Sequence, residues 1–421
     1  MRNRKVTILF LWAMLALCTI LELKVQVRAS SPLESEIEAK LKLLNKPAVK
    51  TIKSEDGDII DCIDIYKQPA FDHPVLKNHT IQSIPSFLLE SQNSSTKDTF
   101  QAETNVFQTW QKSGSCPKGT VPIRRIRRED LLRFDSLDSF GQKPRASFMN
   151  STKTLSSHFP KLNGSKVVIP ENHSASYLVT VGYHYIGAQA DINIWNPRVD
   201  LPEDFTTAQI WLKTGNGPNF ESVEAGWVVN PKLFGDRATR FFNYWTKDSY
   251  LSTGCFDVTC PGFVVTGQVA LGGAIKPVSS TRGTQYDLTV GMFLDPITKN
   301  WWLKVKNNIV VGYWPAILFD ELTQSATIVE WGGQVFSPMV KQTPHTKTGM
   351  GSGDFANGLF GNACYMRNIR IKDYSLKLKY PEFVRPVTEE QYCYNVLNDV
   401  KYGKEPYFYF GGPGQRPPYC P

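Results

Sequence analysis

An alternation of apolar and polar side chains, which is the period of a β-strand, constrains the fold of this chain more than any other feature. It runs through residues 188–194, 208–213 and 288–294. Residues 303–311 add two apolar runs separated by an Asn-Asn pair, which is typical of a β-hairpin. Gly and Pro interrupt these runs at short intervals. The pattern predicts an all-β fold, an antiparallel β-sandwich of the jelly-roll kind.

The first residues are typical of a secretory signal peptide. A basic start is followed by an apolar run over residues 6–23 and by small residues that end at Ala29. The alternative is a signal anchor that stays in the membrane, but Glu22 and Lys24 shorten the run below the ~20 residues that a membrane span needs. We therefore predict a signal peptide over residues 1–29 and export of the rest, without a membrane segment.

The exported chain divides into three parts. Residues 30–134 combine helical spacing of Leu and Ile near the start with short strand-like runs, and they predict a small α+β domain. Residues 135–173 are rich in Ser, Asn, Lys and Pro and predict an exposed, glycosylated linker of the kind that proteases cut. Residues 174–421 then form the predicted β-sandwich domain.

Cysteine usage agrees with an oxidising compartment. Eight cysteines are present, and Cys18 lies in the predicted signal peptide. Spacing suggests three disulfides and leaves Cys364 as a buried, unpaired strand thiol. The suggested pairs are Cys62–Cys116, Cys255–Cys260 and Cys393–Cys420. No Cys-x-x-Cys occurs and histidines are few, so neither a metal site nor a cofactor is expected.

Surface chemistry gives two further expectations. Five Asn-x-Ser/Thr sequons predict glycosylation at Asn78, Asn93, Asn150, Asn163 and Asn172. The net charge of +8 is spread along the chain except for a basic cluster over residues 124–128. A nucleic-acid partner is one interpretation of that cluster, but in an exported protein it favours ionic contacts within the molecule.

Two glutamates are the candidate catalytic residues. The chain contains no His-Glu-x-x-His motif and no Gly-x-Ser-x-Gly motif. Glu224 and Glu330 each lie inside an apolar strand, and the next residue on the same strand face is a glycine, which predicts a groove for an extended chain. Trp227 and Trp331 then point into the core. Two such carboxylates can share a proton and act as general acid and general base, although most strand glutamates are simply solvated.

At these residues the sequence resembles the neprosin family, the plant secreted glutamic peptidases that cleave after proline. The resemblance extends over nearly the whole exported chain. The matching stretches are 63–74, 116–125, 194–197, 223–231, 235–236, 244–246, 253–255, 312–315, 330–333 and 350–353. It is similar to the family's activation peptide over 30–134 and to its peptidase domain over 174–421.

The resemblance implies a β-sandwich with Glu224 and Glu330 as the catalytic pair, without assigning the acid and the base. It also implies the Cys255–Cys260 and Cys393–Cys420 disulfides. Family precursors are inactive because the activation domain inhibits them, and they mature at acidic pH by losing it. Cleavage after Pro160 or Pro170, both in the predicted linker, would suit a proline-directed enzyme that acts on itself. A monomer that acts on proline-rich protein or peptide is expected.

The sequence leaves open two alternative functions, and it departs from the family pattern at two positions. A carboxylate pair on a β-sandwich is also the equipment of a glycoside hydrolase, and a non-catalytic cell-wall binding protein is the third class. Asp354 stands where family members usually carry His, and Cys364 stands where Ala or Ser is common. The site of action is expected to be the extracellular space, the cell wall or an acidic vacuole.

Overall fold

The computed structural model describes residues 32–88, 107–144, 172–216, 219–306 and 308–421. The chain divides into two units, Met1–Leu43 and Leu44–Pro421. The described part of the first unit belongs to helix α2 (Pro32–Leu44), which confirms the helical spacing of Leu and Ile found there. No helix in the described ranges is long and apolar enough to cross a membrane.

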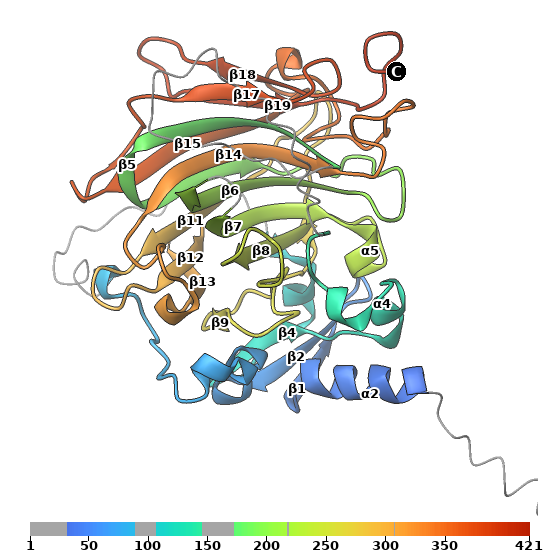
Figure 1. Ribbon diagram of the computed structural model, residues 1–421, viewed down its shortest axis with the longest axis vertical. Coiled ribbons are helices and arrows are strands. Elements are labelled where there is room, and N and C mark those ends of the chain that lie inside the picture. The colour runs from blue at the N-terminus through green and yellow to red at the C-terminus, as the bar shows by residue number, and fades with distance from the viewer. Residues whose placement is uncertain (1–31, 89–106, 145–171, 217–218, 307) are drawn as a thin grey trace, which may run out of the picture. The chain divides into compact units, whose positions relative to one another are not determined.

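The larger unit consists mainly of strands (Figure 1). In chain order the strands are β1 (Ala48–Lys53), β2 (Ile59–Asp64), β3 (Phe107–Gln108), β4 (Thr120–Arg124), β5 (His173–Asn193), β6 (Phe205–Asn216), β7 (Asn219–Val229), β8 (Arg240–Thr246), β9 (Val264–Val265), β10 (Ile275–Lys276), β11 (Asp287–Leu294), β12 (Trp301–Val305), β13 (Ile309–Trp314), β14 (Ala326–Phe336), β15 (Cys364–Asp373), β16 (Leu378–Lys379), β17 (Arg385–Thr388), β18 (Asn395–Asp399) and β19 (Tyr407–Gly411). Short α-helices among its described residues are α4 (Arg128–Leu132) and α5 (Pro231–Phe234), and residues 86–88 are also helical.

A small sheet lies near the start of this unit. Strands β1, β2 and β4 form it in that order, and every pair is antiparallel. The Cys62–Cys116 disulfide ties β2 to the loop that precedes β4. With α4 close behind β4 in sequence, this region has the predicted α+β character.

Strands β3 and β10 form a separate two-stranded sheet. The other strands build the sandwich, and the long strand β5 connects its two layers. Up to Val181, β5 pairs with β14 and β17, whereas from Gly187 on it pairs with β11 and β15. Between these halves lies exposed Gly182, whose φ of +104° suits glycine and lets the strand bend. One layer therefore runs β8-β7-β6-β14-β5-β17, and the other runs β9-β13-β12-β11-β5-β15-β19-β18.

The core lies between these layers. Apolar side chains from both contribute to one buried cluster, for example Ile210, Trp227 and Trp331 from the first layer and Met292 and Leu303 from the second. The predicted antiparallel β-sandwich is therefore confirmed, as is the inward direction of the two tryptophans. Because side chains alternate along a strand, Glu224 and Glu330 point to the opposite face of the first layer.

Local signals explain where β7 ends, a few residues after Glu224. The Asn230 side chain accepts a hydrogen bond from the Leu233 N–H at 3.0 Å and caps helix α5. Pro231 opens the helix, where its missing N–H costs nothing. Gly235 closes it with a φ of +81°, a conformation that glycine adopts without strain.

All three predicted disulfides are present, and Cys364 is a buried free thiol in β15. Among the sequon asparagines, Asn78 is exposed and Asn172 is half-buried, while Asn93, Asn150 and Asn163 lie outside the described residues. Glycosylation at all five stays a prediction.

The predicted exposed linker over 135–173 needs a correction at its start. Phe140 and Lys143 are only 2% exposed, and His173 is already the first residue of β5. A buried lysine inside a polar stretch gives no sequence signal, because its burial depends on a partner elsewhere in the fold. Residues 145–171, with Pro160 and Pro170, lie outside the described residues.

Candidate active site

Glu224 and Glu330 lie on the same face of the same sheet layer. In the antiparallel register of β7 and β6, Glu224 is opposite Trp211, and in the register of β14 and β6, Glu330 is opposite the same Trp211. Residues that are directly opposite share a face, so one strand separates the two glutamates, with about 10 Å between their Cα atoms. Figure 1 shows β14, β6 and β7 side by side. The sheet therefore brings together the two carboxylates predicted from the sequence.

Gly226 and Gly332, the next residues on the same strand face as the two glutamates, are needed for close strand packing and not for the predicted groove. A Cβ atom on Gly226 would lie 2.0 Å from the backbone oxygen of Ala208, and one on Gly332 would lie 2.3 Å from that of Ser176. Neither distance leaves room for a side chain. The glycines therefore allow adjacent strands to approach closely at this point of the sheet.

Glu224 is fully buried and accepts hydrogen bonds on both carboxylate oxygens. Lys143 Nζ donates to Oε2 at 2.5 Å and Gln209 Nε2 donates to the same oxygen at 2.6 Å. Ser222 Oγ donates to Oε1 at 2.8 Å, and the Tyr250 hydroxyl donates to it as well. With four donors, this carboxylate is held in one position.

The charge of Lys143 determines the ionisation of Glu224. Burial raises the pKa of the Glu224 carboxyl, but the Lys143 ammonium and the hydrogen bonds outweigh burial, so the pKa lies below its ordinary value. Lys143 is itself buried and lies over the rings of Tyr244 and Tyr250, at 4.7 and 4.6 Å from their centroids. An ionised carboxylate that is bound to an ammonium group is neither a free base nor a proton donor. In this form of the chain the Glu224 carboxylate is therefore not free to exchange a proton with a ligand.

Glu330 has a lysine partner of its own. Lys213 Nζ, from the neighbouring strand β6, donates to Glu330 Oε2 at 2.6 Å. Lys213 is on the same face as both glutamates, since it lies two residues from Trp211 along β6. Its ammonium group also lies 5.6 Å from the Trp211 ring centroid and 5.5 Å from that of Phe220. The two lysines come from different parts of the chain. Lys213 lies in strand β6, whereas Lys143 lies before β5, the first strand of the sandwich.

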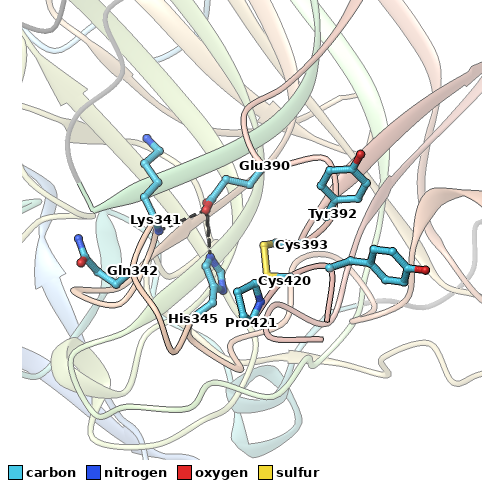
Figure 2. Close-up of a pocket in the computed structure, with 9 residues that line it drawn as sticks. Lys341, Gln342, His345, Glu390, Tyr392, Cys393, Cys420 and Pro421 are labelled. Atoms are coloured by element: carbon cyan, nitrogen blue, oxygen red, sulfur yellow. Dashed lines mark hydrogen bonds and ion pairs between the residues drawn. A yellow bond between two sulfur atoms is a disulfide. The ribbon is translucent and has the colours of Figure 1, made fainter. Parts of the chain in front are cut away.

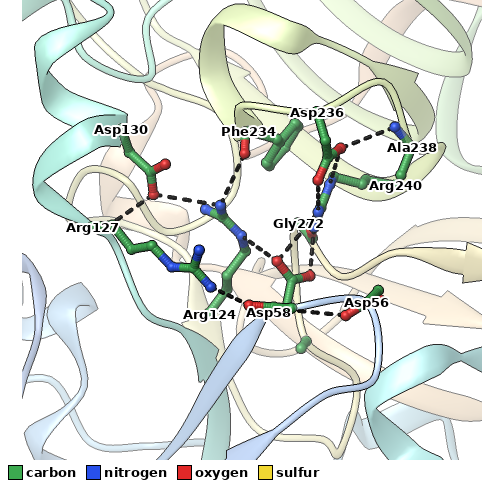
Figure 3. A network of polar contacts seen from close by, with 12 residues as sticks. Asp56, Asp58, Arg124, Arg127, Asp130, Phe234, Asp236, Ala238, Arg240 and Gly272 are labelled. Carbon is green, nitrogen blue, oxygen red and sulfur yellow. Dashed lines mark hydrogen bonds and ion pairs between the residues drawn. The ribbon is translucent and has the colours of Figure 1, made fainter.

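An ionic network that is buried except at Asp236 joins the small N-terminal sheet to the sandwich (Figure 3). Asp58 follows β1 and accepts from Arg240 Nη1 of β8 at 2.6 Å and from Arg124 Nε of β4 at 3.2 Å. Arg240 also binds Asp236 at 2.6 Å, and Arg124 contacts Asp130 at 3.4 Å. Burial raises the pKa of Asp236, but Arg240 outweighs burial and lowers it. Arg124 is the first residue of the basic cluster, so the prediction of contacts within the molecule is confirmed.

Two buried glutamine side chains add to this junction. Gln68 Nε2 donates to the Val265 carbonyl at 3.0 Å, and its Oε1 accepts from the Val265 N–H at 2.7 Å. Gln108 Oε1 accepts from the Ala270 N–H at 2.8 Å, and its Nε2 donates to the Ala270 carbonyl. Each amide therefore satisfies both backbone groups of one sandwich residue, as a neighbouring strand would.

Two surface hollows in the described part of the chain contain neither glutamate. The first, of ≈ 270 Å³, lies at the C-terminal disulfide (Figure 2). In it Glu390 accepts from the Lys341 N–H at 3.2 Å and contacts His345 Nε2 at 3.4 Å. The second, of ≈ 400 Å³, is lined by Phe360, Asp399, Lys401, Lys404, Glu405, Tyr407 and Tyr409.

One group of potential metal ligands occurs among the described residues, in the first of these hollows. Side-chain atoms of His345, Cys393 and Cys420 lie within 4.8 Å of one another. The two cysteines are joined in a disulfide, so neither can supply a thiolate. This group therefore lacks two of its three ligands.

The sequence did not indicate several groups around the glutamates. Lys143 and Gln209 contact Glu224 from positions 81 and 15 residues away, and no motif spacing connects them. Lys213 is one of the polar residues in the alternating run that predicts β6. Its contact with Glu330, however, depends on the register between β14 and β6, which spacing in the sequence does not give. Asp354, the departure noted above, is exposed.

Comparison with known proteins gives a match to two family models. The model described as neprosin matches residues 202–413, which contain both glutamates. The model described as neprosin activation peptide matches residues 51–168, which contain Lys143.

The fold can also be compared with solved structures. Scytalido-glutamic peptidase with a transition-state analogue inhibitor has 9% sequence identity and a TM-score of 0.32, covering 57% of this chain and 98% of that one. SCP-B, an eqolisin-family peptidase in complex with the tripeptide Ala-Ile-His, has 8% identity and a TM-score of 0.28, covering 57% and 96%. A β-porphyranase from the human gut bacterium Bacteroides plebeius has 6% identity and a TM-score of 0.20, covering 38% and 54%.

Proposed function

The chain belongs to the neprosin family and carries the activation peptide of that family, and on this premise we propose that it is the latent precursor of a glutamic endopeptidase. The active form hydrolyses peptide bonds at acidic pH, after proline. The observation that supports this most strongly is the placement of Glu224 and Glu330 opposite one residue, Trp211, on one sheet face. The precursor is exported, and its own activation peptide is its inhibitor.

Latency follows from the contact between Lys143 and Glu224. The lysine lies within the activation-peptide match and the glutamate within the match to the second model. A cut between Lys143 and His173 removes the lysine together with the activation peptide and frees the carboxyl group. Lys213 lies in β6, so it stays with Glu330 after that cut.

Because the cut removes Lys143 but leaves Lys213 in place, we assign different roles to Glu224 and Glu330. Without Lys143, Glu224 loses the largest influence that lowers its pKa against the effect of burial, so the pKa of its carboxyl rises. Glu224 then carries a proton at acidic pH and donates it to the leaving amine or polarises the carbonyl. Glu330 keeps its contact with Lys213 and acts as the base that draws a proton from the water that attacks the peptide carbonyl. The reaction consumes one water and leaves Glu330 protonated and Glu224 ionised. A proton then passes from Glu330 to Glu224 through solvent, which restores both groups for the next turnover.

Acid treatment should generate the active protein. Glu224 and Asp236 have lowered pKa values, so their ion pairs stabilise the precursor above the ordinary carboxyl pKa and lose that contribution as the pH falls through the lowered values. We expect the precursor to cleave itself under acidic conditions, after Pro160 or Pro170. N-terminal sequencing of the acid-treated protein identifies the new end. An end upstream of Lys143 would contradict this account of latency, and one elsewhere in the linker would contradict proline-directed maturation.

The substrate class is tested with the acid-treated protein. We expect it to cleave proline-rich peptides on the carboxyl side of proline, and matched peptides with alanine in place of proline should be cleaved much more slowly. Mass spectrometry of the products locates the cut. Release of sugars from cell-wall glycans without peptide cleavage would support a glycoside hydrolase, and binding to glycans without any cleavage would support a wall-binding protein.

A further inference from the structure

We propose that Gln209 is a positioning residue of the catalytic pair, which holds the Glu224 carboxyl group and accepts a hydrogen bond from a backbone N–H of the bound peptide. The inference rests on the proposed peptidase function. It concerns a residue that lies between the two strands that carry the glutamates and that no motif of the sequence indicates.

The register places Gln209 at the centre of the site. It is opposite Gly226 on β7 and opposite Gly332 on β14, one step along the face from Trp211 and the two glutamates. Since both neighbours are glycines, Gln209 supplies the only side chain in this row across the three strands. It is fully buried.

The amide nitrogen of Gln209 contacts the oxygen that Lys143 also binds. Gln209 Nε2 donates to Glu224 Oε2 at 2.6 Å, whereas Ser222 and Tyr250 donate to Oε1. When Lys143 leaves with the activation peptide, Gln209 is the remaining donor to Oε2 among the described contacts. It therefore fixes the rotation of the carboxyl group and directs Oε2 to the place that the ammonium group occupied.

The amide oxygen of Gln209 is unpaired within the described part of the chain. Oε1 is buried and has no hydrogen-bond partner among the described residues. A buried acceptor without a donor is unfavourable, so it is expected to be occupied when the site is in use. The ligand of the proposed enzyme is a peptide, and its backbone N–H groups are donors of the required kind.

The experiment compares the acid-matured wild-type protein with Gln209→Met, which keeps length and volume but loses the donor and the acceptor. Deleting a hydrogen bond to a charged or reacting group should lower kcat roughly 10- to 100-fold. It should also shift the alkaline limb of the pH profile to higher pH, because the lost donor favoured the ionised form of Glu224. Gln189→Met is the matched control. Gln189 is half-buried and lies in the part of β5 that pairs with β11, so its replacement should leave both kcat and the pH profile unchanged.

The acceptor role is tested with substrates in which ester oxygen replaces the backbone N–H groups near the scissile bond, one at a time. One replacement should lower kcat/KM for the wild type and have no further effect on Gln209→Met. Equal losses in both proteins would overturn the acceptor role. Loss of kcat without a shift of the pH profile, or wild-type behaviour in Gln209→Met, would overturn the positioning role. An inactive wild-type protein would instead overturn the proposed function itself.

Discussion

Glu224→Gln and Glu330→Gln should each lower the peptidase activity of the matured protein by about 10²- to 10⁴-fold, the contribution that a general acid or base makes. Glutamine keeps the shape of each side chain but can neither hold nor release the catalytic proton. In the proposed assignment, Glu224→Gln removes the proton donor, whose ionisation is responsible for the alkaline limb of the pH profile, and Glu330→Gln removes the base that activates water. Steady-state kinetics across the acidic range measure both effects.

These variants are not expected to mature by themselves. Their precursors are therefore converted with a small amount of tagged wild-type protein, which is then removed. Glu382→Gln, a change at a surface residue that contacts the Tyr183 hydroxyl at 2.8 Å, is the control and should keep wild-type activity. Wild-type kinetics in either active-site variant would show that its glutamate is not part of the mechanism.

Replacement of Lys143 should destabilise the precursor and raise the pH at which it matures. In Lys143→Met the buried Glu224 carboxylate loses its ammonium partner, and breaking a buried ion pair in this way costs about 3–5 kcal/mol. The pair in the wild type stabilises latency above the ordinary glutamate pKa and loses that effect as the pH falls through the lowered pKa. The variant needs no such protonation, so we expect its maturation midpoint to lie at least about one pH unit higher.

Two further variants test whether the effect of Lys143→Met comes from the loss of the Lys143–Glu224 ion pair. Lys232→Met removes a more exposed pair with Asp135, at 3.4 Å, and should leave the maturation midpoint unchanged. The double variant Lys143→Met/Glu224→Gln removes both charges and should recover most of the lost stability in urea unfolding at neutral pH. A wild-type midpoint in Lys143→Met would refute the role of this ion pair in latency.

The fold could be predicted because its signals are local. Two-residue alternation identified strands such as β6 and β11, and the Asn-Asn pair marked the β12–β13 hairpin. The paired glutamates were also recognisable, since each lies in an apolar strand next to a glycine. Their shared face was not, because it depends on the registers of β7 and β14 against β6.

The groups around the glutamates depend on tertiary contacts. Lys143 lies in a stretch whose composition is typical of an exposed linker, and only the buried Glu224 carboxylate explains why it is buried. The predicted groove at the two glycines was wrong for a similar reason. Alternation correctly places each glycine on the same face as its glutamate, but the closeness of the Ala208 and Ser176 backbone oxygens is a property of the folded sheet.

The central claim is that Glu224 and Glu330 act as one pair across β6, and a comparison of the two single variants with Glu224→Gln/Glu330→Gln tests it most directly. Residues that act as a unit have strongly non-additive effects on kcat. We predict that the double variant is no slower than the slower single variant, with kcat measured on the matured proteins at the acidic optimum. A double variant in which the two losses multiply would contradict the claim.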